Sequence, residues 1–234
     1  MIKTNNKMKR MSIMEEKEKK RLFVDIDGTL AEWRKISLEI ESEEDRFEVM
    51  SKMNEILLKP GYFTTLKPHE NVIEAVFLLS KKYEVFVISC VIPKDGEPNP
   101  VSEKNDWLDH HVSFVDEDHR IFVPDGENKM NYIPGGIRIG DALLDDYSKN
   151  LKDASRAGMT GIKLLNNVNE NKGAWYGPGV SMDYLPENIA KGIELVMENK
   201  ELVRHEAPKK TTDAFLSIDK NTDIDSIDFE KDLF

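Results

Sequence analysis

An apolar run that ends in two aspartates constrains this chain more than any other feature. The segment Leu22–Leu30 reads LFVDIDGTL, with Asp25 and Asp27 separated by one residue. Apolar runs bounded by turn formers are typical of buried strands, so we expect a strand over residues 22–27 that carries both carboxylates at its end. Strand alternation would send the two side chains the same way. Carboxylates this close repel each other unless a proton or a cation lies between them.

The alternative is that Asp27-Gly28-Thr29 simply ends the strand as a polar turn. The second aspartate, the apolar strand before it and polar residues farther along the chain favour a functional site over this simpler interpretation. Strand-like and helix-like segments alternate along the rest of the chain. Further strands are expected over residues 84–90, 121–123, 142–144 and 161–165, and helical patterns over 33–58, 68–79, 101–112, 149–157 and 186–204. Such alternation predicts an α/β fold with a parallel sheet and right-handed crossovers.

The domain organisation is expected to be one core with one insertion. Residues 21–32 and 64–206 would form the core, and residues 33–63 a helical insertion placed to act as a lid over the end of the first strand. Residues 1–20 form a charged leader and residues 207–234 an acidic tail, both expected to be flexible. A length of 234 residues suits one α/β domain with a small insertion.

Composition narrows the class of partner. The net charge of −11 disfavours a DNA or RNA polymer as partner, but a small anionic substrate stays compatible if a metal and local cations offset the field. The single cysteine, Cys90, fits a reducing cytoplasm, and no apolar run reaches membrane-spanning length. We expect a cytoplasmic protein that does not enter a membrane; oligomerisation stays open.

Polar groups of complementary kinds follow other predicted strands. Ser89 ends the second strand, Asp145-Asp146 follow Ala142-Leu143-Leu144, and Lys129 lies in a loop rich in glycine and proline. In a parallel sheet these ends meet at one edge. Carboxylates suit Mg²⁺, a hydroxyl suits a phosphate oxygen, and a lysine supplies positive charge. Lys104 or Lys149 could replace Lys129 in this set, and Asp141 could replace Asp145.

These motifs resemble those of the haloacid dehalogenase superfamily of phosphotransferases over residues 21–165. Its Asp-x-Asp-Gly-Thr motif is similar to residues 25–29, its strand-end hydroxyl to Ser89, its lysine to Lys129, and its acidic pair to Asp145-Asp146. Within the superfamily the chain resembles the 5′(3′)-deoxyribonucleotidase family. The additional similarity lies in Leu30–Trp33, Pro60–Phe63, Leu66, Phe86–Ser89 and Trp107-Leu108.

The resemblance implies a Rossmann-like parallel sheet with a small helical cap after the first strand, and Mg²⁺-dependent removal of phosphate from nucleoside monophosphates. Asp25 would be the nucleophile and Asp27 the acid and base. Ser89, Lys129 and Gly28 would bind phosphate. Asp25, Asp27, Asp145 and Asp146 would serve the metal.

Two points of the interpretation remain open at this stage. Trp33 and Phe63 are candidates for contacting the substrate from the cap, although either could instead belong to the cap core. Other functions compatible with the sequence are a phosphatase acting on a sugar phosphate or similar metabolite, and a catalytically silent binding protein.

Overall fold

The structure is a computed structural model that describes residues 19–32, 55–92, 96, 99–168 and 175–198. The expected leader and tail therefore lie largely outside the described residues, as does most of the expected insertion, including Trp33. In the part that is described, no helix combines the length and apolarity that a membrane crossing requires.

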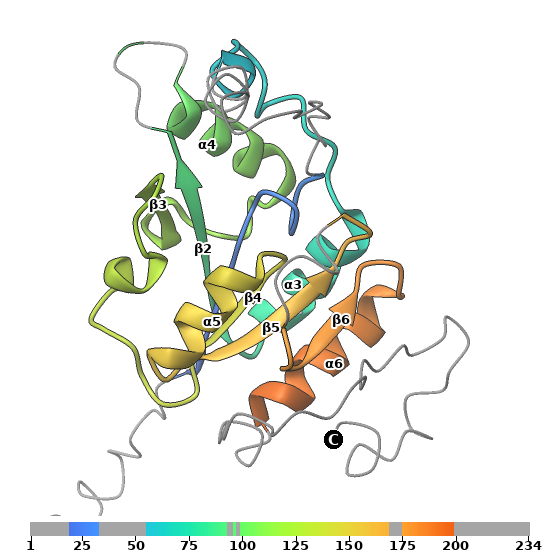
Figure 1. The fold of residues 1–234 in the computed structure, drawn as a ribbon. Helices are drawn as coiled ribbons and strands as arrows, with labels where there is room; N and C mark the ends of the chain where they lie inside the picture. Colours follow the sequence, from blue (N-terminus) through green and yellow to red (C-terminus); the bar gives the residue numbers. More distant parts are fainter. Residues whose placement is uncertain (1–18, 33–54, 93–95, 97–98, 169–174, 199–234) are drawn as a thin grey trace, which may run out of the picture.

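Six parallel strands form a single sheet in the order β3-β2-β1-β4-β5-β6 (Figure 1). The strands are β1 (Arg21–Val24), β2 (Glu84–Val91), β3 (Arg120–Pro124), β4 (Ala142–Asp145), β5 (Thr160–Leu165) and β6 (Gly179–Ser181). The expected parallel α/β fold is confirmed. The chain builds outward from β1 to β3 on one side and from β4 to β6 on the other, so the order reverses between β1 and β4. Ligands of open α/β sheets bind at the carboxyl ends beside such a reversal.

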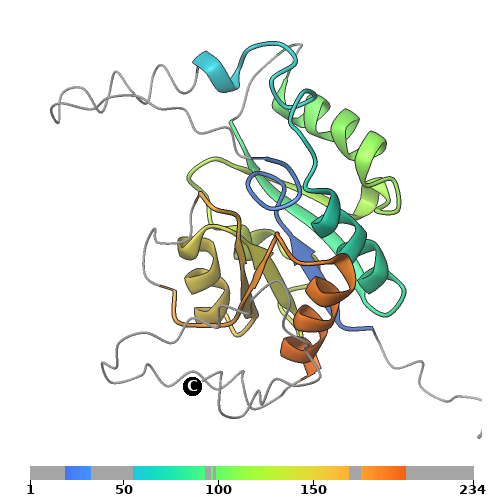
Figure 2. The same cartoon turned by 90° about the vertical axis from the view of Figure 1, so that its right-hand side faces the viewer.

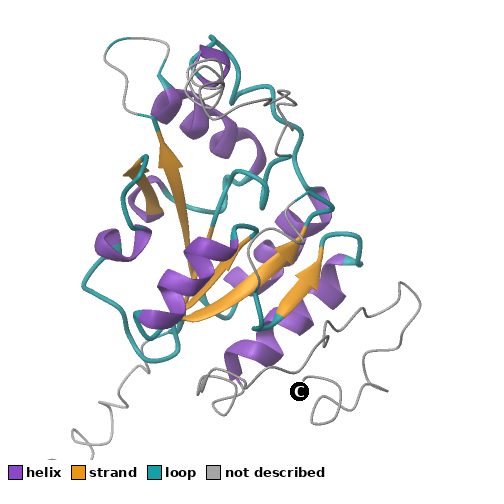
Figure 3. Cartoon of the chain, in the orientation of Figure 1, coloured by secondary structure: helices purple, strands orange, loops and turns teal. Residues whose placement is uncertain are grey.

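Helices cover both faces of the sheet (Figures 2 and 3). They are α3 (Glu70–Ser80), α4 (Pro100–His111), α5 (Ser148–Arg156) and α6 (Pro186–Glu198), with short 3₁₀ segments η1 (Glu117–His119) and η2 (Lys129–Tyr132). Helices α3, α4 and α6 contribute to the core on one face, and α5 with the residues around η2 to the core on the other. Trp107 and Leu108 pack inward from α4, as the sequence predicts.

Alternation along β1 supplies both cores. Leu22 and Val24 face the side of α3 and α6, whereas Phe23 faces the opposite side and stacks on Phe86 with ring centroids 5.0 Å apart. A strand buried on both faces reads as a continuous apolar run, which explains the sequence pattern. The strand ends at Val24, however, so the prediction of a strand over residues 22–27 is wrong at its end. Asp25 follows the strand directly, with its N–H bonded to the Leu144 carbonyl at 3.0 Å, and Asp27 lies in the turn beyond it.

A buried ion pair closes the opposite, amino-terminal edge of the sheet. The Arg21 guanidinium donates to both carboxylate oxygens of Asp141, at 3.0 and 2.5 Å. It also donates to the carbonyl oxygens of Pro134 and Gly136, each at 2.6 Å, in the connection that follows η2. Asp141 precedes β4 and is committed to this pair, so it does not take the place of Asp145 at the carboxyl edge.

Candidate active site

The turn after β1 is built around the carbonyl of Ile26. The backbone N–H groups of Thr29, Leu30 and Ala31 all donate to this oxygen, at 3.1, 2.9 and 2.9 Å. Gly28 takes a φ of +83° in the turn, a region that side chains disfavour, and its N–H donates to the Ala31 carbonyl at 2.8 Å. The turn thereby presents Asp25 and Asp27 at the carboxyl edge of the sheet.

Lys129 lies between carboxylates from two neighbouring strand ends. Its Nζ is 2.8 Å from Asp25 Oδ1 and 2.8 Å from Asp145 Oδ2, and its side chain is almost fully buried. Burial disfavours the ammonium, but Asp145 and Asp25 outweigh this effect and raise the pKa of Lys129 above its ordinary value. The lysine is therefore a fixed positive charge beside Asp25.

Asp145 is held by donors as well as by Lys129. Its Oδ1 accepts from the backbone N–H of Tyr147 at 2.8 Å, and its Oδ2 accepts from Asn150 Nδ2 at 2.9 Å. Burial nevertheless raises the pKa of Asp145 to about 6, against the opposing effect of Lys129. A carboxylate with so many partners is suited to fixing Lys129.

A second lysine, Lys104 of α4, serves Asp27. Its Nζ donates to Asp27 Oδ2, to Ser89 Oγ at 2.9 Å and to the Cys90 carbonyl at 2.9 Å. The Ser89 hydroxyl lies 3.3 Å from the same Asp27 oxygen. Burial raises the pKa of Asp27 above its ordinary value, whereas Lys104 lowers it and the nearby Asp25 raises it further. A carboxyl group with a raised pKa is suited to giving up a proton as a general acid.

Asp146 contacts the turn after β1 from the end of β4. Asn166, the residue after β5, donates through Nδ2 to Asp146 Oδ2 at 2.8 Å and to the Gly28 carbonyl at 2.7 Å. A Cβ built on Gly28 would lie 2.3 Å from Asp146 Oδ2. Gly28 is therefore required for the close approach of the carboxylate as well as for the turn.

The carboxylates form a set that fits a divalent cation. Asp25, Asp145 and Asp146 each offer an oxygen, and the three oxygens lie within 4.8 Å of one another. Asp27 Oδ1 is buried without a hydrogen-bond partner among the described residues. Lys129 pairs with Asp25 and Asp145, and Lys104 pairs with Asp27, so these three carboxylates share two lysines. Oxygen ligands with this charge suit Mg²⁺.

The structure places the remaining sequence candidates as follows. Phe63 is buried, and its ring centroid lies 4.6 Å from Lys104 Nζ, so it lies beside the site as part of the core. Lys149 is exposed and pairs with Asp153 on α5, away from this cluster. Lys129 holds the position next to Asp25 for which Lys104 and Lys149 were alternatives.

Sequence reasoning missed the pairing of Lys104 with Asp27 and the contacts of Glu103 and Asn166. Glu103 accepts the backbone N–H groups of Gly61 and Phe63, at 2.7 and 3.0 Å. A signal for the α4 residues was present: Asn99 caps the helix and Pro100 begins it, which places Glu103 and Lys104 one turn from the inward Trp107. No comparable signal marks Asn166.

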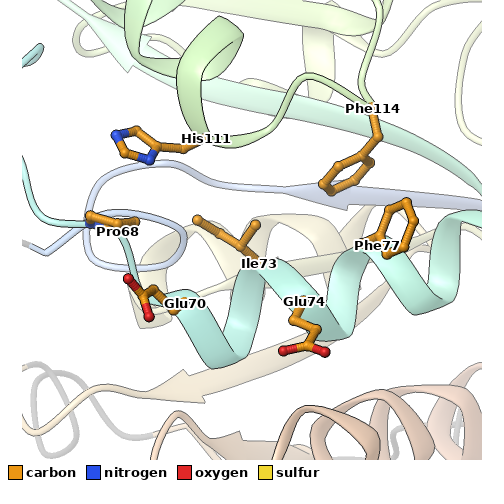
Figure 4. Close-up of a pocket in the computed structure, with 7 residues that line it drawn as sticks. All are labelled: Pro68, Glu70, Ile73, Glu74, Phe77, His111 and Phe114. Atoms are coloured by element: carbon orange, nitrogen blue, oxygen red, sulfur yellow. The ribbon is translucent and has the colours of Figure 1, made fainter.

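A separate hollow of about 320 Å³ lies against α3. Figure 4 shows the residues that line it, which are Pro68, Glu70, Ile73, Glu74, Phe77, His111 and Phe114. Phe77 and Phe114 meet edge to face with ring centroids 5.3 Å apart. None of the carboxylates or lysines of the candidate site lines this hollow.

Similarity to known proteins indicates the family to which these site residues belong. The family model described as "5' nucleotidase, deoxy (Pyrimidine), cytosolic type C protein" matches residues 45–173, which is more than half of the chain. The chain belongs to this family. The match begins beyond the Asp25–Thr29 turn and includes Ser89, Lys104, Lys129 and the Asp145-Asp146 pair.

Curated relatives agree with the family. A Staphylococcus aureus protein named "Putative 5'(3')-deoxyribonucleotidase" is 25% identical over 124 residues, covering 51% of this chain and 59% of the relative. A Staphylococcus epidermidis protein of the same name is 25% identical over 118 residues, covering 50% of this chain and 59% of the relative. The match thus spans less than two thirds of these relatives.

A solved structure shares the fold. The D,D-heptose 1,7-bisphosphate phosphatase from B. bronchiseptica, complexed with magnesium and phosphate, covers 75% of this chain and 98% of its own, with a TM-score of 0.50 and 11% sequence identity. The expected resemblance to the haloacid dehalogenase superfamily and its deoxyribonucleotidase family is confirmed by the family match and the relatives.

Proposed function

We propose that this nucleotidase-family protein is a phosphatase that hydrolyses nucleoside 5′-monophosphates, deoxyribonucleotides among them, with Mg²⁺ as cofactor. The family description and the names of the relatives support the substrate class. The observation that carries the chemistry is the arrangement of two aspartates on two different lysines. Asp25 pairs with Lys129, and Asp27 pairs with Lys104.

This pairing suggests unequal roles for the aspartates. An Asp25 oxygen attacks phosphorus, a P–O bond to Asp25 forms, and the bond from phosphorus to the ester oxygen breaks. The departing 5′ oxygen takes its proton from Asp27, whose pKa burial raises above the ordinary value for an aspartate. Asp27 then takes a proton from water, and the resulting hydroxide attacks the aspartyl-phosphate. Asp25 leaves as a carboxylate, together with inorganic phosphate.

The other residues hold charge and position. Lys129 lies against Asp25 and offsets the charge of the approaching phosphate, while Asp145 fixes Lys129. Ser89 and Lys104 keep Asp27 in place. Asp25 and Asp146 would hold Mg²⁺ together with the backbone carbonyl of Asp27, and Asp145 lies beside them. The cation, when bound, supplies a counter-charge to the phosphate oxygens.

The insertion over residues 33–63 would cover the site and select the leaving group. Trp33 stays a prediction for a substrate contact, because it lies outside the described residues. The cytoplasmic location stays a prediction from the single cysteine and the absence of a long apolar run.

The test is phosphate release by the full chain from dUMP, dTMP, IMP, a sugar phosphate and a generic aryl phosphate, with and without EDTA. We expect release from nucleotides that EDTA abolishes and Mg²⁺ restores. Asp25→Asn should abolish turnover in a folded protein, and Asp153→Asn, at a partly buried and ion-paired position of α5 away from the site, is the matched control. Release from the sugar phosphate alone would favour the metabolite phosphatase, and no release from any ester would favour a silent binding protein.

A further inference from the structure

The side chain of Asn166 joins three strand ends at the candidate site. Asn166 follows β5 directly and is 5% exposed. Its Nδ2 donates to Asp146 Oδ2 at 2.8 Å, at the end of β4, and to the Gly28 carbonyl at 2.7 Å, in the turn after β1. Its Oδ1 accepts the N–H of Val168 at 3.0 Å. The amide thus links the end of β4 to the turn after β1, and the hydrogen bond from Val168 fixes the amide itself.

Asp146 is confined from a second direction by Gly28. The 2.3 Å between Asp146 Oδ2 and the position of a Cβ on Gly28 shows that the carboxylate lies directly against the glycine. Asn166 binds the same oxygen and the carbonyl of the same glycine. The Asn166 amide and the absence of a side chain at Gly28 therefore both contribute to the position of Asp146.

The two neighbouring aspartates are held by groups of different charge. Asp145 is held in part by the ammonium of Lys129, which offsets its negative charge. Asn166 is neutral, so its hydrogen bond orients Asp146 without adding a positive charge of its own beside that carboxylate. A neutral amide thus suits a carboxylate that binds a cation. Its hydrogen bond fixes the orientation of the carboxylate but does not compete with the cation as a second positive charge would.

We infer that Asn166 is a positioning residue that sets the Mg²⁺ affinity of Asp146. This inference rests on the cation of the proposed function. It concerns the residue that orients the ligand and not the chemical step, so it can be tested by binding alone.

The test measures Mg²⁺ binding to the purified full chain by titration calorimetry, and the rise of the melting temperature with Mg²⁺ concentration. Asn166→Ala removes both hydrogen bonds that Nδ2 donates, to Asp146 and to the Gly28 carbonyl. We expect the dissociation constant for Mg²⁺ to rise by about 10- to 100-fold. Turnover of dUMP should recover toward the wild-type kcat at high Mg²⁺. A residue with only a structural role would lower the melting temperature without metal and leave the Mg²⁺ dependence unchanged.

Asn71→Ala is the matched control, because the Asn71 amide also donates to a backbone carbonyl, that of Tyr184 at 3.1 Å, on the outside of α3. It should bind Mg²⁺ as the wild type does. If Asn166→Ala does not fold, Asn166→Ser, which keeps one donor, decides the matter by the same titration. A dissociation constant within twofold of the wild type in the folded variant would overturn the inference.

The outcomes separate this inference from the proposed function. A wild-type protein that binds Mg²⁺ but releases no phosphate would overturn the proposed function, while the Asn166 comparison would still stand or fall by binding. A wild-type protein that binds no Mg²⁺ would overturn the inference.

Discussion

Replacing Gly28 by alanine tests how the candidate site depends on close packing. The new Cβ would lie 2.3 Å from Asp146 Oδ2, and ordinary contact begins about 1 Å farther out. The carboxylate or the turn must therefore shift by about that distance. A misplacement of about 1 Å in a catalytic arrangement costs about 100-fold in rate, so we expect kcat/KM for dUMP to fall by about 100-fold and Mg²⁺ affinity to fall as well.

The same substitution also costs backbone energy, because Gly28 has a φ of +83°. A side chain in this region costs about 1–2 kcal/mol, which urea unfolding would detect. Gly158→Ala is the matched control: its φ is +91°, and a Cβ there meets nothing within 4 Å. It should lose similar stability and keep full activity and Mg²⁺ affinity. Equal kinetics and Mg²⁺ affinity in Gly28→Ala and Gly158→Ala would refute the reasoning.

Two further predictions concern pH. Lys104 lowers the pKa of Asp27, so Lys104→Met should raise that pKa and shift the alkaline limb of the kcat–pH profile to higher pH; an unmoved limb would contradict the assignment of Asp27 as the acid. Hydrogen bonds from Tyr83 and Lys20 lower the pKa of Glu198 to about 2 from 4.5, so its carboxylate stabilises the fold above pH 4.5, and this contribution disappears as the pH falls toward 2. The difference in urea midpoint between wild type and Glu198→Gln should shrink as the pH falls from 4.5 to 2. A constant difference would argue against the hydrogen bonds that Tyr83 and Lys20 donate to Glu198.

The residues that sequence could place are those that follow apolar runs. Asp25 and Asp145 come at or just beyond the end of such a run, and parallel strands bring their ends to one edge. The expectation that Ser89 ends its strand is wrong, because β2 continues through Cys90 to Val91, where both residues still pair with β3. Lys129 is in a loop, and only the structure shows that its ammonium reaches Asp25 and Asp145. The pattern thus gave the edge of the sheet and the residue types, and the structure added the pairing.

The remaining parts depend on contacts that no local pattern records. The helix start at Asn99-Pro100 places Lys104 one turn from Trp107, but the pairing of Lys104 with Asp27 follows from how α4 packs. Asn166 and Asn167 are adjacent and identical in type, so the sequence does not tell which amide turns inward. Strand β6 has only three residues, Gly179–Ser181, and no apolar run that would predict it. Strand β1 ends earlier than expected, because hydrogen bonds to the Ile26 carbonyl form a turn where the sequence pattern predicts strand.

The shortness of β1 has a consequence for local motion. This four-residue strand carries Arg21 at one end and is followed directly by Asp25, and the connection that contains Lys129 contacts both. If that connection detached, the buried pairs Arg21–Asp141 and Lys129–Asp25 would be exposed or broken. Leaving one buried charge without its partner costs about 3–5 kcal/mol. The backbone amides of β1 and η2 should therefore exchange with deuterium as one cooperative unit, at a rate close to that of global unfolding.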